Sequence, residues 1–148
     1  MRISIGSDHA GFEQKQQLVE YLKSLGHEVT DRGPDTDDRV DYPDYAIKVA
    51  MDVSFNRDDF GILVCGTGIG MSIFANKIVR VRAANVTIPE FAELARAHND
   101  ANVLCLSGRF IDIDTNKEIV DKFLATEFEG GRHAKRLAKL LPIERTGA

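Results

Sequence analysis

The sequence predicts an α/β fold: a Rossmann-like, doubly wound parallel sheet of five strands, with helices on both faces and a basic C-terminal helix. Short apolar segments of strand length alternate with amphipathic segments of helix length along the whole chain. Repeated strand–helix units imply parallel strands whose crossovers place helices on both faces. The 148 residues show no linker and no internal repeat, which predicts a single domain, 1–148.

The first strand–helix–strand unit is predicted near the N-terminus. Ile3 to Gly6 forms an apolar strand, and Glu28 to Asp31 forms a short second strand. The intervening helix ends at Gly26. Its apolar face is formed by Leu18, Leu22 and Leu25. The aspartate-rich segment from Arg32 to Asp44 is predicted to be a solvated surface loop.

Two more strands are predicted in the middle of the chain. The helix before them carries apolar residues on one side, namely Ile47, Ala50, Met51 and Phe55. Ile62 to Cys65 is a continuous apolar strand, and Arg82 to Val86 is the next strand. A short helix is expected between them, behind a glycine-rich turn.

One strand and three helices are predicted in the last third of the chain. The first helix is marked by Ile88, Phe91, Ala92 and Ala95. Val103 to Leu106 follows as the fifth strand. Thr115 and Glu118 have capping-box spacing, which predicts the start of the next helix. After Gly130-Gly131, a basic helix is expected to about Leu141.

The turn after the third strand has the sequence Cys65-Gly66-Thr67-Gly68-Ile69-Gly70. Glycines let the backbone turn sharply and approach a ligand closely. The N–H groups at the start of the following helix form a positive pocket for an anion or a developing oxyanion. Because positive potential favours a thiolate, Cys65 at the mouth of this pocket is a candidate catalytic residue.

Composition narrows the choice of function classes. The formal net charge of −4 argues against a broad nucleic-acid surface. No apolar run approaches membrane-spanning length, and the N-terminus has no signal-peptide core. The two cysteines, Cys65 and Cys105, have neither CxxC nor zinc-ligand spacing. These features predict a cytoplasmic protein with no membrane or nucleic-acid partner, and they give no indication of a metal or other cofactor.

The predicted topology divides the candidate residues between two edges of the sheet. In such sheets ligands bind outside the carboxyl ends of the strands. Asp8-His9, the glycine loop and Arg109 follow strands and therefore share that edge. His98-Asn99 ends a helix of about eleven residues, about 16 Å from that edge. A site that combines His98 with Cys65 thus requires a second subunit, and a symmetric dimer would have two shared sites.

Several motifs occur in the order found in type-B ribose-5-phosphate isomerases, which the chain resembles over nearly its whole length. They are Gly6-Ser7-Asp8-His9-Ala10-Gly11, Asp41-Tyr42-Pro43, Cys65-Gly66-Thr67-Gly68-Ile69-Gly70, Ala75-Asn76-Lys77, His98-Asn99-Asp100 and Glu129-Gly130-Gly131-Arg132-His133. One branch of that family has a glutamate base just after the glycine loop. Met71 stands there in this chain, so it resembles the cysteine branch.

The resemblance implies interconversion of ribose 5-phosphate and ribulose 5-phosphate, without metal, by a homodimer or dimer of dimers. It implies that Cys65 is the base, that Thr67 assists proton movement and that His98 helps to open the sugar ring. The remaining residues would bind substrate: Asp8, His9, Tyr42, Gly66, Gly68, Ile69, Gly70 and Asn99, with Arg109, Arg132 and Arg136 placed for the phosphate.

Two other functions remain open at this point. The same family includes allose- and galactose-6-phosphate isomerases, whose substrates have one extra carbon. Cys65, Thr67 and His98 in one chain argue against the galactose type, which works as two different subunits. A non-catalytic module that binds nucleotides or sugar phosphates is the third hypothesis. The spacing Gly66-x-Gly68-x-Gly70 is not GxGxxG, which makes a dinucleotide site a weak alternative.

Each motif also has a purely structural interpretation. Asp8 could cap a helix, and His98 could simply favour a helix C-terminus. Cys105 is predicted to be a core residue. Arg132 and Arg136 could form a solvated face. His133, Lys135 and Lys139 are predicted to lie on such a face or to pair with acidic neighbours.

Overall fold

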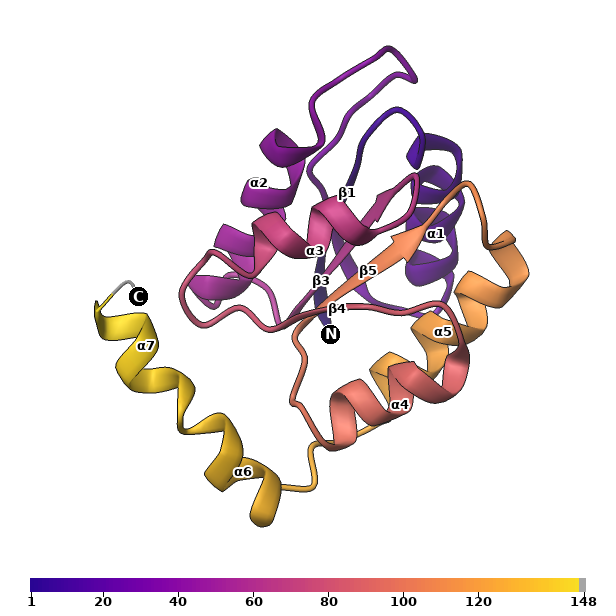
Figure 1. Ribbon diagram of the computed structural model, residues 1–148. Helices are drawn as coiled ribbons and strands as arrows, with labels where there is room; N and C mark the ends of the chain where they lie inside the picture. Colours follow the sequence, from indigo (N-terminus) through magenta and orange to yellow (C-terminus); the bar gives the residue numbers. More distant parts are fainter. Residues whose placement is uncertain (147–148) are drawn as a thin grey trace.

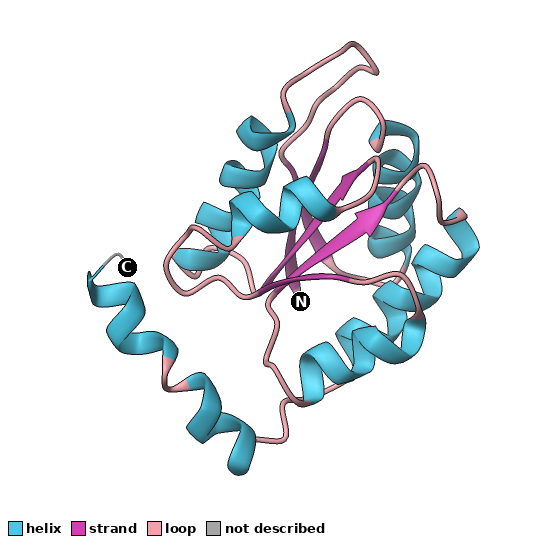
Figure 2. Cartoon of the chain, in the orientation of Figure 1, coloured by secondary structure: helices cyan, strands magenta, loops and turns pink. Residues whose placement is uncertain are grey.

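The computed structural model describes residues 1–146 and contains a five-stranded parallel sheet flanked by helices (Figures 1 and 2). The strands are β1 (Arg2–Ser7), β2 (Glu28–Asp31), β3 (Phe60–Cys65), β4 (Ala83–Asn85) and β5 (Val103–Ser107). The helices are α1 (Phe12–Ser24), α2 (Tyr42–Ser54), α3 (Ile69–Ala75), α4 (Pro89–Ala97), α5 (Ile113–Ala125), α6 (Arg132–Leu137) and α7 (Leu140–Thr146). The predicted fold class is confirmed.

The strands lie in the order β2-β1-β3-β5-β4, and all neighbours pair in parallel. Consecutive residues of β3 face opposite sides of the sheet. Ile62 and Val64 belong to a core cluster that includes Leu18 of α1 and Phe123 of α5. Leu63 and Cys65 belong to a second cluster with residues of α2 and α3. Two cores on opposite faces define the doubly wound arrangement.

Helices α2 and α4 leave part of the predicted apolar face exposed. In α2, Val49 is fully buried, whereas Ile47 is 42% exposed and Phe55, just after the helix, is 56% exposed. The reason is the shape of the sheet, because Gly6 and Gly61 leave room for Val49. In α4, the alanines predicted as core are buried, but Phe91 is exposed.

Several helix boundaries also differ from the predictions. Helix α2 begins at Tyr42, so the aspartate-rich loop is shorter than expected. Helix α5 begins before the predicted capping box, because the side chain of Asp112 accepts hydrogen bonds from Thr115 N and Oγ1. The predicted basic C-terminal helix is two helices, α6 and α7. They form an arm that stands away from the sheet in Figure 1.

A buried lysine anchors the loop before α2. Lys15 Nζ lies 3.0 Å from both carboxylate oxygens of Asp31 and donates to Pro34 O at 2.8 Å. The side chain of Lys15 is fully buried, so its charge must be paired. This contact holds the loop over the carboxyl edge of the sheet. Within residues 1–146, no helix has both the length and the apolar character needed to cross a membrane.

Candidate active site

The loop between β3 and α3 places a thiol beneath a glycine turn. Cys65 is the last residue of β3, and its Sγ accepts a hydrogen bond from Gly68 N at 3.1 Å. Gly68 has a φ of +85°, and a Cβ there would collide with Asn85 and with the backbone of Leu106. Only glycine fits this conformation and this close approach. The thiol is therefore held at a fixed place at the carboxyl edge.

The other backbone amides of this turn are candidate donors for a ligand. Thr67 Oγ1 accepts a hydrogen bond from Ile69 N at 3.1 Å. Within residues 1–146, the N–H groups of Gly66, Thr67 and Gly70 have no hydrogen-bond partner. Unpaired amides beside a thiol are the arrangement that stabilises a developing oxyanion.

The loop after β5 is fastened to the glycine turn. Gly108 N donates to Cys65 O at 2.8 Å, and Arg109 N donates to Gly66 O at 3.2 Å. The hydroxyl of Ser107 adds a bond to the same Gly66 oxygen at 2.7 Å. The Arg109 side chain lies directly over Gly66. A permanent positive charge thus lies beside the glycine turn.

The loop after β1 completes this edge. Asp8 N donates to Val64 O at 3.1 Å, and the Asp8 carboxylate accepts from Gly11 N at 3.0 Å. His9 Nδ1 accepts a hydrogen bond from Val40 N at 3.3 Å. A neutral His9 therefore carries its proton on Nε2, which is left to donate to a ligand.

Tyr42 packs against the beginning of α3. Its ring meets Phe74 edge-on at a centroid distance of 5.6 Å. A Cβ at Gly70 would lie 2.7 Å from the same tyrosine ring, so this position also needs glycine. Tyr42 thus forms a wall of the site. The structure brings Asp8, His9, Tyr42, the loop Cys65–Gly70 and Arg109 together at one sheet edge.

A cavity of about 330 Å³ opens beside this edge. Its lining is His9, Ala10, Glu13, Gln14, Gln17, Asp37, Gly108 and Ile113. It joins the loop after β1 to the loop after β5. The cavity thus leads past His9 toward the segment that carries Arg109.

His98 does not join this group within one chain. It follows α4 and precedes β5, whose first residue, Val103, pairs with Gly61 at the beginning of β3. Cys65 pairs with Ser107 at the other end of β5. Four residues of strand span about 13 Å. His98 and Cys65 therefore lie at opposite edges of the sheet.

Three of the predicted substrate-binding residues, Asn99, Arg132 and Arg136, also lie away from the carboxyl edge. Asn99 lines a cavity of about 360 Å³ between the sheet and the C-terminal arm, together with Leu137 and Leu140. Arg132 and Arg136 are exposed on α6. In contrast, His133 is 5% exposed. The prediction that His133 lies on a solvated face is wrong. The alternative prediction, that it pairs with an acidic neighbour, fits Glu129, whose carboxylate lies 3.4 Å from His133 Nε2.

Some residues that shape the site were not singled out from the sequence. With its amide oriented to donate, Asn85 Nδ2 lies 3.3 Å from the oxygens of Thr67 and Cys105. Asn116 Nδ2 donates to Gln14 Oε1, and Gln14 Nε2 donates to Gly108 O and to Ile111 O, which supports the loop after β5. Asn85 ends β4, so a polar residue at a strand end was the available signal.

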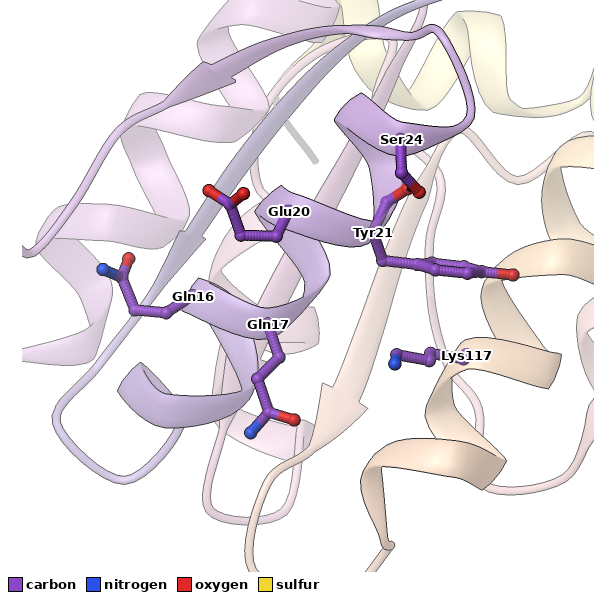
Figure 3. A pocket seen from close by; sticks show the side chains of 6 residues that line it. All are labelled: Gln16, Gln17, Glu20, Tyr21, Ser24 and Lys117. Atoms are coloured by element: carbon purple, nitrogen blue, oxygen red, sulfur yellow. Dashed lines mark hydrogen bonds between the residues drawn. The ribbon is translucent and has the colours of Figure 1, made fainter.

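Two features outside this edge do not contribute to it. Burial, together with the nearby Cys65, raises the pKa of the Cys105 thiol, and Cys105 is confirmed as a core residue. A groove between α1 and α5 is shown in Figure 3, where Lys117 approaches the ring of Tyr21. It is lined by Gln16, Gln17, Glu20, Tyr21, Ser24 and Lys117. None of these six is a predicted site residue.

One cluster within residues 1–146 has donor atoms for a metal ion. The side chains of His98, Glu129 and His133 offer ligand atoms that all lie within 4.8 Å of one another. The cluster is at the amino edge of the sheet, apart from Cys65.

The sequence matches the Ribose/Galactose Isomerase family over residues 3–140. This match covers both the glycine loop and the segment around His98. The chain belongs to this family. A relative from Escherichia coli, ribose-5-phosphate isomerase B, is 44% identical over 143 residues, which cover 97% of this chain and 96% of the relative.

Solved structures of the family agree closely with this isomerase fold. Ribose-5-phosphate isomerase B of Clostridium thermocellum is 46% identical, with a TM-score of 0.98 and complete coverage of both chains. The enzyme from Mycoplasma genitalium, solved with bound ribulose-5-phosphate, is 47% identical with a TM-score of 0.94. That match covers 97% of this chain and 96% of the other.

Proposed function

We propose that this protein is a type-B ribose-5-phosphate isomerase that interconverts ribose 5-phosphate and ribulose 5-phosphate. The observation that carries the proposal is the Cys65 thiol, fixed 3.1 Å from Gly68 N beneath a turn with unpaired amides. Support also comes from the relatives of that name, including one with ribulose-5-phosphate bound.

The reaction moves a carbonyl group between C1 and C2 of the open sugar. A base removes a proton from one carbon, and the electrons form an enediolate whose oxygens become negative. We infer that Cys65, as thiolate, is this base. The amides of Gly66, Thr67 and Gly70 would stabilise the enediolate, with Gly68 and Ile69 holding the turn in shape. The Thr67 hydroxyl would move a proton between the substrate oxygens.

The substrate's sugar and phosphate require further contacts. Asp8, Tyr42 and the Nε2 proton of His9 would contact the sugar at the carboxyl edge. Arg109, over Gly66, is placed for an anionic group. Arginine keeps its charge at all working pH values and offers several donors, so it suits a phosphate.

The remaining residues would come from a second subunit. Ribose 5-phosphate exists mostly as a ring, and ring opening needs an additional acid/base group. Histidine titrates in the suitable range. Because His98 lies at the opposite edge from Cys65 within one chain, we propose that His98, Asn99, Arg132 and Arg136 complete the partner's site. The active form would be a homodimer or a dimer of dimers.

The alternatives concern the length of the sugar and whether the site is catalytic. A hexose 6-phosphate would place its phosphate one carbon farther from Cys65, and a binding module would leave Cys65 dispensable. The two free thiols fit a reducing compartment, so the cytoplasm remains the expected location.

Isomerase assays on ribose 5-phosphate, allose 6-phosphate and galactose 6-phosphate, without added metal, test the proposal. We expect the highest kcat/KM for the pentose. Preference for a hexose phosphate would select the first alternative. Binding of all three without turnover would support the non-catalytic module.

A further inference from the structure

His98 lies in a group of three side chains drawn from two segments of the chain. His98 follows α4, whereas Glu129 precedes α6 and His133 is in its first turn. The two imidazole rings are stacked, with centroids 4.3 Å apart and an interplanar angle of 14°. The Glu129 carboxylate lies 3.8 Å from His98 Nε2 and 3.4 Å from His133 Nε2.

The backbone holds these segments in place. Glu129 N donates to Ala97 O at 3.0 Å, one residue before His98. His133 N donates to Gly130 O at 3.1 Å. The segment before α6 is thus attached to the end of α4, and the stack does not depend on side-chain contacts alone.

His133 is the buried member of this group. It is 5% exposed, and its Nε2 has no hydrogen-bond partner within the described residues. Burial, followed by the nearby positive charge of Arg132, lowers the pKa of His133. The buried His133 ring therefore lies against the His98 ring, whose side chain is 38% exposed.

The stacked geometry favours ring positioning over metal binding. An imidazole binds a metal through a lone pair that lies in the plane of its ring. Two nearly parallel rings, one above the other, cannot both aim such lone pairs at one ion between them. The parallel faces instead provide a contact surface that fixes the orientation of His98.

We propose that Glu129 and His133 are positioning residues for His98: His133 fixes the plane of its ring, and the nearby carboxylate of Glu129 orients its Nε2 edge. This inference rests on the proposed function, in which His98 assists ring opening. Because Nε2 is turned toward Glu129, Nδ1 is the ring nitrogen left to exchange a proton with the sugar.

The chemical step shows why such positioning matters. In ring opening, the hydroxyl on C1 loses its proton, a C1=O double bond forms, the bond from C1 to the ring oxygen breaks, and that oxygen gains a proton. His98 must therefore face one oxygen with a defined nitrogen in a defined charge state.

The test separates ring opening from proton abstraction. Ribulose 5-phosphate has no ring, because the hydroxyl that would close it carries the phosphate. Exchange of its C1 hydrogen with D2O, followed by NMR, reports the proton abstraction by the base. Conversion of ribose 5-phosphate reports the whole reaction, including ring opening. The ratio of these two rates is the readout, and a merely structural defect lowers both rates equally.

We expect Glu129→Gln and His133→Ala to lower conversion about tenfold while C1 exchange stays within about twofold. His133→Phe keeps an aromatic face under His98 and should recover most of the conversion rate. Glu127→Gln, on the same segment and exposed, is the matched control and should change neither rate. If His133→Ala does not fold, Glu129→Gln still tests the proposal, because the Glu129 side chain is 56% exposed and its replacement should not disturb folding.

Parallel loss of both rates, or no loss in Glu129→Gln, would overturn the positioning proposal. His98→Asn, measured in the same way, keeps the two proposals distinguishable. If His98→Asn shifts the ratio but the Glu129 and His133 variants do not, only the positioning role is overturned. If His98→Asn leaves the ratio unchanged, the ring-opening role of His98 is overturned as well.

Discussion

The two edges of the sheet hold their functional side chains in different ways. At the carboxyl edge, Cys65 and Arg109 lie in adjacent loops that share backbone hydrogen bonds. At the amino edge, His98 and His133 are held by ring stacking and by a segment that leads to the C-terminal arm. The first edge is assembled by its own chain. The second edge has two histidines and a carboxylate in place, and this cluster of the described residues contains no cysteine.

This difference indicates how the fold divides the proposed reaction. Proton abstraction needs a fixed base and fixed amides, which a βα turn provides locally. Ring opening needs an acid/base group that reaches the sugar from another direction, and in the proposed dimer the end of α4, together with the arginines of α6, would supply such groups to the neighbouring subunit. Variants at the two edges should therefore have separable effects.

The largest effect is expected for Cys65→Ala. Loss of the base should lower turnover about 10³-fold and leave substrate binding nearly intact, because the proposed phosphate contacts lie elsewhere. Cys105→Ala, which removes the core thiol, is the matched control and should keep its turnover. Steady-state kinetics and circular dichroism of both proteins provide the measurement, and near-normal turnover by folded Cys65→Ala would exclude the cysteine mechanism.

His98→Asn should have the next largest effect. We expect turnover of the cyclic pentose to fall about 10²-fold, because the acid/base group for ring opening is lost. Turnover of an acyclic aldose phosphate, such as erythrose 4-phosphate, should fall much less relative to the wild-type enzyme. An equal loss of turnover on both sugars would show that His98 has a role other than ring opening.

Mixing Cys65→Ala with His98→Asn tests whether the carboxyl edge of one subunit meets the amino edge of another in a dimer. After subunit exchange, a mixed dimer of Cys65→Ala and His98→Asn has one site with both lesions and one with neither. Random exchange makes about half of the dimers mixed. Activity should therefore recover to about a quarter of wild type. Absence of recovery after demonstrated exchange would mean that one subunit supplies both residues.

The smallest effect is expected for Ser107→Ala at the carboxyl edge. The Ser107 hydroxyl donates to Gly66 O and accepts from Phe110 N at 3.0 Å. Its loss should lower the free energy of unfolding by about 1 kcal/mol and turnover about threefold, because the glycine turn becomes looser. Ser24→Ala removes an exposed hydroxyl on α1 and serves as the control in thermal melts and kinetics. Unchanged turnover in Ser107→Ala would show that the backbone bonds alone fix the turn.

Sequence patterns predicted the strands well because each strand is a short apolar segment next to glycine or polar residues. Glu28–Asp31 matches β2 without change. The buried faces of the helices were predicted less well: Phe91 was expected in the core of the protein but is exposed. An amphipathic pattern reveals that a helix has an apolar side. Where apolar residues cover more than one side, however, the pattern does not specify which side is buried. The shape of the surface beneath decides which one is buried.

The sequence by itself determined the parallel α/β fold, the glycine turn with its thiol, and the separation of Cys65 from His98. These features depend on local patterns and on the order of strands and helices along the chain. Only the tertiary structure decided that Asn85 supports the glycine turn, that Val49 rather than Ile47 faces the sheet, and that His133 lies beneath His98. Those contacts join residues far apart in the chain, and they depend on how closely the backbones approach, which no local pattern specifies.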